Sequence, residues 1–359
     1  MAASPKAAAA SAPFVLTTQF VVEAALTACA CAAHAAYLLQ GYSLVASEGM
    51  AAGLRDPVLS FLQLRIGTSS ALPAIPVTGP AFYLAAVYAL SWYMGSRPRD
   101  AAPFALPGVM AAYNAYATLL SGAMFALFVA QFAQHTPGLA LLTYRLPRDA
   151  PRLWAAAMWV NYQSKYIEYA DTLIAVLRGK TDQVSDLQLI HHAEMGPLMF
   201  VFCSLCPGGQ AALGPCINSF VHFVMYGYYG LTGVKALPAL TGAVKPYITT
   251  LQMLQFVILL VQSCYHLFFF DVMWDSRCVI LQFFLMLQML CVGAAPGGRA
   301  RGHRPGLPCA RSLLTLPSLS RTKHTRARRS YMFKNFFVRS YLGGEGKGAR
   351  GAKDASKAA

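Results

Sequence analysis

The stretch LWAAAMWVNYQSKYIEYADTLIAVL, residues 153–177, decides how the rest of the sequence is interpreted. It is largely apolar, and as a helix it is long enough to cross a bilayer, which takes about 20 residues. Its middle nevertheless carries Lys165, Glu168 and Asp171. Because charged side chains inside a membrane span are expensive and usually face the interior of a helix bundle, this stretch predicts a membrane helix that contributes to a functional site.

Similar apolar stretches recur along the chain, which has 359 residues, 56% of them hydrophobic and 12% charged. Soluble globular proteins carry about 25% charged residues, so a water-soluble fold is disfavoured. The sequence lacks the alternation of apolar and polar residues that is typical of an outer-membrane barrel. Because hydrocarbon leaves unpaired backbone groups unsatisfied, the stretches are interpreted as helices. They lie at about 14–40, 79–95, 104–132, 153–177, 187–205, 211–231 and 246–270, with a weaker run at 278–291.

The predicted fold class is therefore an all-α integral membrane protein, a bundle of about seven core transmembrane helices with one extra span before them. The segment 14–40 supplies that extra span, and its alternative is a cleaved targeting sequence. Its apolar run is longer than the core of a signal peptide and lacks a strongly basic start, which favours a span. Residues 44–77 carry Gly, Pro and Ser and predict a polar linker, so that 1–77 form an N-terminal extension.

The net charge of +15 is concentrated in the C-terminal tail. From Val292 onward there are 15 Lys or Arg residues and two acidic ones, a net +13. A basic segment after a final span is typical of the cytosolic side of a membrane. We therefore expect a cytosolic C-terminus and no nucleic-acid partner.

Nine cysteines are scattered along the chain, and Cys203 and Cys206 form a CxxC pair. A zinc site needs further ligands at a matching spacing, and Cys216 alone does not supply them. Thiols that pack between helices are the favoured interpretation.

Four of the apolar segments carry polar residues at helical spacing. A pair such as Lys165 and Glu168 offsets part of the cost of burial, and buried glutamines can simply bond between helices, so each group alone has a structural alternative. Four groups on successive segments instead predict one enclosed polar chamber. The groups are Lys165, Glu168, Asp171 and Thr172; Gln188, His191 and His192; Asn218, His222, Tyr226 and Tyr229; and Thr249, Gln252 and Gln255.

The chemistry that this chamber suits follows from its residue types. Imidazole, with an unperturbed pKa of about 6.5, acts near neutral pH as a nucleophile, a base or an electrostatic stabiliser. Amides and phenols can hold developing enolate or oxyanion charge. Spacing alone does not rank the imidazoles of His191, His192 and His222. The spacing of Gln188, three and four residues before the two adjacent histidines, predicts that its amide stacks against both rings.

The four groups resemble the signatures KxxExxDT, HxxHH, HxxMYxYY and TxxQxxQ of the ELO family of fatty acid elongases. The chain has KYIEYADT at 165–172, QLIHH at 188–192, HFVMYGYY at 222–229 and TTLQMLQ at 249–255, in the family's order. The resemblance covers about 78–291, the expected catalytic domain, and again 331–342. It implies a multi-pass protein of the endoplasmic reticulum membrane with seven core spans and a cytosolic C-terminus.

The resemblance also implies an activity, that of a very-long-chain 3-oxoacyl-CoA synthase. In this family an acyl group moves from CoA to an active-site imidazole, and decarboxylation of malonyl-CoA yields the carbanion that attacks it. By motif position, His191 and His222 take part in this step and His192 lies beside them. The residues expected at the substrates are Lys165, Glu168, Asp171, Thr172, Gln188, Asn218, Tyr226, Tyr229, Gln252 and Gln255.

Malonyl-CoA is the implied co-substrate, and no other cofactor and no metal ion is expected. The implied partners are acyl-CoA, membrane lipids, and the reductase and dehydratase enzymes of the elongation cycle. The sequence departs from the family pattern where Gln188 replaces the first histidine of HxxHH. Glutamine keeps hydrogen bonding but cannot coordinate as imidazole does, which argues against a three-histidine metal site. In this respect the chain is similar to algal and protist elongases of polyunsaturated acyl chains.

Two other classes of membrane protein compete with this interpretation. Di-iron desaturases also carry HxxHH and need about eight histidines, but His34, His135, His303 and His324 lie far from the motifs here. A transporter or receptor with a buried polar site would share the charged residues but would not consume acyl-CoA. Condensation by a cysteine is disfavoured because neither Cys203 nor Cys206 lies within an acid/base group.

The C-terminal region contains a further anomaly. The apolar run 278–291 holds 14 residues, about 21 Å as a helix, which is short of a 30 Å hydrocarbon core. Residues 292–330 are rich in Gly, Pro, Arg and Ser and predict an insert outside the functional fold, interpreted as retained intron sequence. The sequence YMFKNFFVRSYL at 331–342 resembles the end of the family's last span, and 343–359 would be a cytosolic tail. The alternative is a genuine basic insert that docks on anionic lipid.

Overall fold

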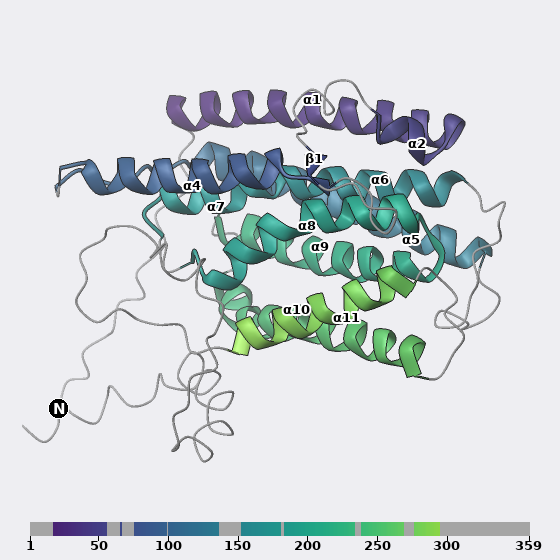
Figure 1. The fold of residues 1–359 in the computed structure, drawn as a ribbon. Helices are drawn as coiled ribbons and strands as arrows, with labels where there is room; N and C mark the ends of the chain where they lie inside the picture. Colours follow the sequence, from purple (N-terminus) through teal and green to yellow (C-terminus); the bar gives the residue numbers. More distant parts are fainter. Residues whose placement is uncertain are drawn as a thin grey trace, which may run out of the picture.

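A computed structural model describes residues 17–55, 65–66, 75–98, 100–135, 152–180, 183–233, 238–268 and 276–294. Within these ranges the chain is almost entirely helical, which confirms the predicted all-α fold class (Figure 1). Two short strands, β1 (Arg65–Ile66) and β2 (Ile75–Pro76), form an antiparallel pair. The helices are α1 (Thr18–Glu48), α2 (Met50–Gly53), α4 (Thr78–Ser96), α5 (Pro107–His135), α6 (Arg152–Ile167), α7 (Tyr169–Leu177), α8 (Asp186–Leu205), the 3-10 helix η2 (Gly209–Ala212), α9 (Leu213–Gly233), α10 (Pro238–Phe268) and α11 (Ser276–Ala294).

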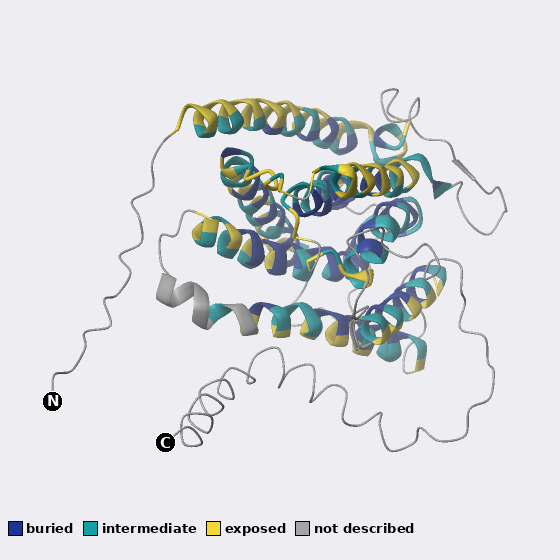
Figure 2. Cartoon of the chain, turned by 90° about the vertical axis from the view of Figure 1, so that its left-hand side faces the viewer, coloured by how far each residue is buried: buried dark blue, intermediate teal, exposed yellow. Residues whose placement is uncertain are grey.

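Three helical segments are long and apolar enough to cross a membrane: Thr18–Glu48, Pro107–His135 and Tyr247–Phe268. Large apolar side chains such as Leu26, Leu119 and Val261 are exposed on them. Figure 2 shows this outward exposure most clearly along α1. Because such a surface is stable in hydrocarbon and costly in water, the chain is a multi-pass membrane protein.

The helices pack in layers that run roughly parallel to one another. In Figure 1, α1 forms one outer layer, and the pair α10 and α11 forms the opposite one. Between them lie α5 packed against α9, and α4 packed against α7 and α8. The polar motifs of α6 to α9 therefore lie on helices between the two outer layers, and the motif of α10 lies on one of the outer layers.

The N-terminal helix α1 packs on α5 and α6 through specific contacts. Gly41 leaves the space that the buried ring of Trp159 occupies, since a Cβ atom at this position would overlap that ring. The Trp159 Nε1 donates to the backbone oxygen of Gly53 at 3.0 Å. At the other end of α1, the Glu23 carboxylate accepts from the Gly108 backbone N–H at 3.0 Å, in the first turn of α5, where helices favour negative charge.

The predicted segments match the observed helices, with three differences. Residues 44–53 do not belong to a polar linker as predicted, because α1 continues to Glu48 and α2 follows it. The segment 153–177 is interrupted at Glu168, so that α6 and α7 are separate helices. The third difference is that α10 begins at Pro238, before the predicted start at 246.

The last described helix bears on the predicted insert. α11 has 19 residues, about 28 Å of helix, and it is longer at both ends than the apolar run. The 14 residues of the apolar run alone indicated a span too short to cross the bilayer. The observed helix of 19 residues is nearly long enough to cross the hydrocarbon core. The predicted insert 292–330 and the segments 331–342 and 343–359 lie almost wholly outside the described residues.

Candidate active site

The centre of the site is a buried ion pair at the junction of α6 and α7. Lys165 is on the last turn of α6, and its Nζ lies 2.6 Å from Oε1 of Glu168, the residue between the two helices. Both side chains are buried. The predicted pairing is confirmed. Either charge would be costly to bury alone, and each residue compensates the charge of the other.

Asn218 of α9 connects this ion pair to the neighbouring helices. Its Oδ1 accepts from Lys165 Nζ at 2.9 Å, and its Nδ2 lies 3.3 Å from Nε2 of His222 and 3.4 Å from Oε1 of Gln255. Since an ammonium group can only donate, Lys165 determines which end of the amide carries the oxygen. The Asn218 amide nitrogen is therefore the end that faces the imidazole and α10.

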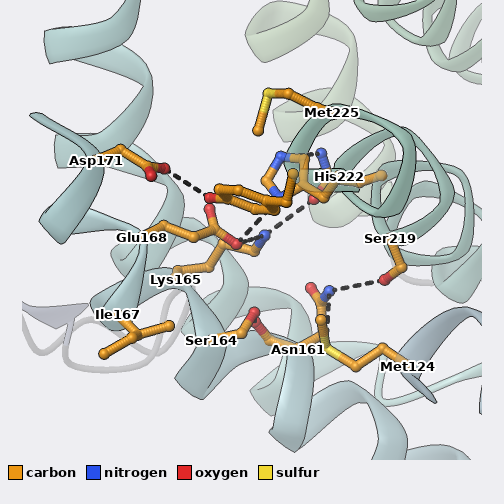
Figure 3. A network of polar contacts seen from close by, with 12 residues as sticks. Met124, Asn161, Ser164, Lys165, Ile167, Glu168, Asp171, Ser219, His222 and Met225 are labelled. Carbon is orange, nitrogen blue, oxygen red and sulfur yellow. Dashed lines mark hydrogen bonds and ion pairs between the residues drawn. The ribbon is translucent and has the colours of Figure 1, made fainter. Parts of the chain in front are cut away.

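His222 is held from both sides, and Figure 3 shows it pointing toward the ion pair. Its Nδ1 lies 3.4 Å from Glu168 Oε1, and its Nε2 receives the Asn218 amide N–H. The neutral tautomer consistent with these partners carries its proton on Nδ1 and a lone pair on Nε2. Lys165, Glu168, His222 and Asn218 thus form a closed ring of polar contacts.

Asp171, one turn further along α7, orients a phenol next to this ring. The Tyr226 OH donates to Asp171 Oδ2 at 2.6 Å. The ring of Tyr226 meets that of His222 edge to face, with 5.6 Å between centroids. The predicted polar face of α9 therefore places His222 and Tyr226 against α6 and α7.

Thr172 and Gln188 form a second, smaller contact group. The Thr172 hydroxyl lies 2.9 Å from the Tyr83 OH of α4 and accepts from Gln188 Nε2 at 3.2 Å. The Gln188 amide therefore bonds to α7, and the stacking of this amide on the rings of His191 and His192 stays a prediction.

The adjacent histidines of α8 face different neighbours. Their rings are 5.7 Å apart, centroid to centroid, and nearly perpendicular. His191 faces Phe256 of α10, with 6.4 Å between centroids, whereas His192 faces Tyr83 of α4 at 6.1 Å. This follows from the helix itself, because consecutive residues project about 100° apart. Nδ1 of His191 is buried and has no hydrogen-bond partner among the described residues.

A cavity of about 50 Å³ lies between α8, α9, α10 and α11. His191, Asn218 and Gln255 line it, so it touches the polar ring described above. Most of its remaining wall is apolar, formed by Met195, Met199, Phe202, Ala211, Gly214, Pro215, Phe256, Leu259, Leu285, Met286 and Met289. The site is therefore the polar end of an otherwise apolar cavity.

Two of the predicted residues lie at the edge of this cluster, where the Tyr229 ring meets that of Tyr226 with 6.4 Å between centroids. The Gln252 Nε2 contacts Met225 Sδ at 3.2 Å. The Tyr229 side chain is 40% exposed, and it lines a separate cavity near the start of α5. The remaining predicted residues, Lys165, Glu168, Asp171, Thr172, Gln188, His191, His192, Asn218, His222, Tyr226 and Gln255, lie in or beside the cluster.

Sequence reasoning missed three residues that contribute to the site. Tyr83 contacts Thr172 and His192 from a helix that carries no polar motif. Asn161 and Gln282 line the cavity. The signal for Asn161 was its position four residues before Lys165, and the signal for Gln282 was that it is one of two amides, with Gln288, inside the apolar run 278–291. Both belong to the pattern of polar residues at helical spacing.

Within the described residues, no group of three or more His, Cys, Asp and Glu side chains is arranged to hold a metal ion. Cys203 is buried in the main apolar core, and its Sγ donates to the backbone oxygen of Met158 at 3.5 Å. Cys206 is buried in the same core. These contacts are those of thiols that pack between helices.

The comparison with known proteins agrees with the motifs. Very long chain fatty acid elongase 2 of Rattus norvegicus is 34% identical over 180 residues, covering 50% of this chain and 64% of the relative. Very long chain fatty acid elongase 5 of Homo sapiens is 33% identical over 186 residues, covering 51% and 62%. The same-named protein of Xenopus tropicalis is 34% identical over 184 residues, covering 51% and 60%. The chain thus matches less than two thirds of the length of each relative.

A broader match comes from the family as a whole. The sequence profile described as "ELO: GNS1/SUR4 family" matches residues 69–295, well over half of the chain. These residues include α4 to α11 and every side chain of the polar cluster. With four ordered motifs gathered at one buried site inside that match, the chain belongs to the ELO (GNS1/SUR4) family.

Proposed function

We propose that this protein is a fatty acid elongase of the endoplasmic reticulum membrane. It condenses a long-chain acyl-CoA with malonyl-CoA and releases a 3-oxoacyl-CoA, CoA and CO2. The observation that carries the proposal is the imidazole of His191, which lines a largely apolar cavity together with Asn218, whose amide nitrogen lies 3.3 Å from Nε2 of His222. The cavity of about 50 Å³ is smaller than the roughly 300–1,000 Å³ of ligand pockets, so a long acyl chain enters only when the surrounding helices move apart, and His191 at the polar end then meets the reactive thioester.

In the first step His191 attacks the carbonyl carbon of the acyl thioester. A C–N bond forms, the C–S bond breaks, and CoA departs as a thiolate that takes up the imidazole proton. Nδ1 of His191 has no partner among the described residues, so this ring has a nitrogen free for the reaction. Both N–H groups of the Asn218 amide, which lines the same cavity, are directed to His222 and Gln255, so one of these contacts must break before this amide can donate to the oxyanion that develops.

In the second step malonyl-CoA loses CO2. The C–C bond to the carboxylate breaks and its electron pair remains on the α-carbon, conjugated with the thioester as an enolate. That carbon attacks the acyl-imidazole, the new C–C bond forms and the C–N bond breaks, and the departing imidazole nitrogen takes up a proton from water or from the CoA thiol, which returns neutral His191. The malonyl carboxylate and the enolate each carry one negative charge, and loss of CO2 moves that charge onto the thioester oxygen, where N–H donors at the site would stabilise it.

Glu168 and His222 support both steps. The Glu168 carboxylate accepts from Nδ1–H of His222 and also neutralises Lys165. A positive charge that develops on His222 therefore lies beside this carboxylate. His192 faces Tyr83 rather than the cavity, which assigns it to positioning α4 against α8. Malonyl-CoA is the co-substrate, and the reductase and dehydratase of the elongation cycle are the enzymes that consume the product.

The acyl chain is proposed to be polyunsaturated. The support for this is Gln188, whose amide bonds to Thr172 where most family members have a histidine by motif position.

The first test of the elongase function is direct: microsomes that contain the protein are supplied with acyl-CoA and malonyl-CoA labelled at the free carboxylate, and labelled CO2 and 3-oxoacyl-CoA are measured. A transporter or receptor would bind acyl-CoA but release no CO2, and that result would overturn the proposal.

The assignment of the two imidazoles has its own test. We expect His191→Ala and His222→Ala each to reduce condensation to background while the protein still inserts into the membrane and folds, because each removes a group with no substitute in the ring. Insertion is checked by protease protection and folding by thermal melting in detergent. Near-normal turnover in either variant would show that this imidazole is not part of the reaction.

A further inference from the structure

Beyond the polar ring, a second group of amides borders the same cavity. Gln282 of α11 donates through Nε2 to Ser263 Oγ at 3.1 Å and to Gln262 Oε1 at 3.0 Å, both on α10. Gln262 in turn donates to the backbone oxygen of Gln210 in η2 at 3.1 Å. All four side chains are buried. No motif includes them, and the proposed reaction does not use them.

These hydrogen bonds determine how the Gln282 amide is oriented. Its nitrogen lies among three acceptors, which are Gln262 Oε1, Ser263 Oγ and the backbone oxygen of Leu259 at 3.2 Å. Gln262 uses its own nitrogen on Gln210, and Ser263 donates its hydroxyl to Leu259 at 2.9 Å, so both present lone pairs to Gln282. The Gln282 Oε1 is therefore the opposite end of the amide. The contacts of Gln282 with Leu259, Gln262 and Ser263 all use its nitrogen, and its oxygen is not among the fully buried atoms that lack a partner, so it keeps some exposure to the cavity that Gln282 lines.

Gln282 lies well beyond the reacting centre along the cavity. On α11, Gln288 donates to both carboxylate oxygens of Glu194 on α8, at 3.0 and 3.1 Å, which sets the register of the two helices. α11 runs antiparallel to α8 (Figure 1). Gln282 is therefore level with residues near 200 on α8, about nine residues or roughly 13 Å beyond His191. The cavity of about 50 Å³ is smaller than a long acyl chain needs, so a chain attached at His191 passes this amide only when the helices that form the apolar wall move apart.

Asn161 of α6 presents a similar group nearer to the reacting centre. Its Nδ2 lies 3.5 Å from Ser219 Oγ. Ser219 donates its hydroxyl to the backbone oxygen of Pro215 at 2.7 Å, so it can only accept from Asn161. The Asn161 Oδ1 is left buried without a partner among the described residues, and Asn161 lines the same cavity.

Two amide oxygens without donors have a consequence for any chain that fills the cavity. A buried carbonyl group that meets only saturated methylenes loses its hydrogen bonds to water and gains none in return. A methylene between two double bonds is more acidic than a saturated one and is a better C–H donor to such an oxygen. The two oxygens therefore disfavour a saturated chain and partly recover their interactions with a polyunsaturated one.

We propose that Gln282 and Asn161 are specificity-determining residues that favour polyunsaturated over saturated acyl chains of equal length. The inference rests on the proposed elongase function, and it assigns the substrate preference to the wall of the cavity, away from the reacting atoms. Each C–H···O contact is worth about a two- to fivefold preference.

The test measures a ratio, so it does not depend on how much protein folds. Microsomes receive an equimolar mixture of a saturated and a polyunsaturated acyl-CoA of one chain length, with malonyl-CoA, and both products are quantified. We expect Gln282→Leu to lower the ratio of polyunsaturated to saturated product about two- to fivefold, and Asn161→Leu to lower it by a similar factor. Gln288→Leu is the matched control, because Gln288 is on the same helix but bonds to Glu194 and does not line the cavity.

The outcomes separate the two proposals. If the wild-type protein forms no product from any acyl-CoA, the elongase function itself fails. If it elongates but the ratio is unchanged in both Gln282→Leu and Asn161→Leu, the specificity inference is wrong. An equal shift in the Gln288→Leu control would also overturn it, since general changes in α11 would then explain the result. A third measurement supplies a hydroxylated acyl-CoA of the same chain length. If the protein prefers it to the polyunsaturated one, the two oxygens recognise a hydroxyl donor and the specificity inference is wrong.

Discussion

At the scale of single residues, Glu168 contacts two groups, the buried ammonium of Lys165 and the imidazole of His222. It neutralises Lys165 in a buried place and holds the Nδ1 side of His222. Removing its charge therefore has two separable effects: it leaves a buried cation unpaired, and it releases the imidazole.

We expect Glu168→Gln to destabilise the protein by about 3–5 kcal/mol, because breaking one side of a buried ion pair leaves the other charge uncompensated. Adding Lys165→Met should recover much of that stability, since the apolar replacement removes the charge. Activity should stay near background in both variants because the neutral amide oxygen accepts from His222 more weakly than the carboxylate does. Thermal melting in detergent and the condensation assay measure the two effects. Recovery of activity in the double variant would mean that Glu168 has only a structural role.

Gln188 is a second residue whose role can be separated from catalysis. Its amide reaches Thr172, which also contacts Tyr83, so it acts on the position of α7 relative to α4 and α8. We expect Gln188→His to change the ratio of polyunsaturated to saturated products by more than it changes total turnover. Products from a mixed panel of acyl-CoAs measure both. An unchanged ratio would remove Gln188 as a basis for the proposed substrate preference.

At the scale of helices, α1 belongs to the packed bundle although the family match begins only at residue 69. It packs on α6 where Gly41 meets the ring of Trp159, a side chain that is fully buried. α6 carries Lys165 near its end, so this contact supports the helix that positions the ion pair.

We expect Gly41→Leu to lower the stability of the protein by about 1–3 kcal/mol, because any side chain at this position overlaps the Trp159 ring and forces α1 or the ring to shift. Leu39→Ala is the control, since Leu39 is 70% exposed on the outer face of the same helix and should change stability little. Thermal melting in lipid nanodiscs compares the two. An equal loss in both variants would show that the Gly41 contact has no special importance.

At the scale of the whole molecule, the remaining question is whether residues 292–330 belong to the functional protein. Their Gly, Pro, Arg and Ser content is that of a chain that cannot bury a core. We expect deletion of 292–330, which joins α11 to YMFKNFFVRSYL at 331–342, to leave condensation activity unchanged or raised. The assay is the release of CO2 from malonyl-CoA in microsomes, normalised to the amount of inserted protein. Loss of activity on deletion, or a spliced transcript that contains the insert, would contradict this prediction.

Much of the fold and part of the site could be predicted from the sequence because the signals are local. Apolar length predicts where helices lie, and residues three or four apart share a face whatever the helix packs against. The pairing of Lys165 with Glu168, within one turn, is such a local contact. The motif order and the resemblance it carries are also properties of the chain alone.

What only the tertiary structure decided is how the helices are rotated and aligned against one another. Periodicity shows that His191 and His192 project differently, but only packing shows that one meets the cavity and the other Tyr83. The orientation of the Asn218 amide depends on Lys165, 53 residues away in sequence, and that of Gln282 depends on α10. The reason is physical: a helix satisfies its own backbone hydrogen bonds, so its sequence determines that it forms, while its rotation and register depend on side chains from other helices.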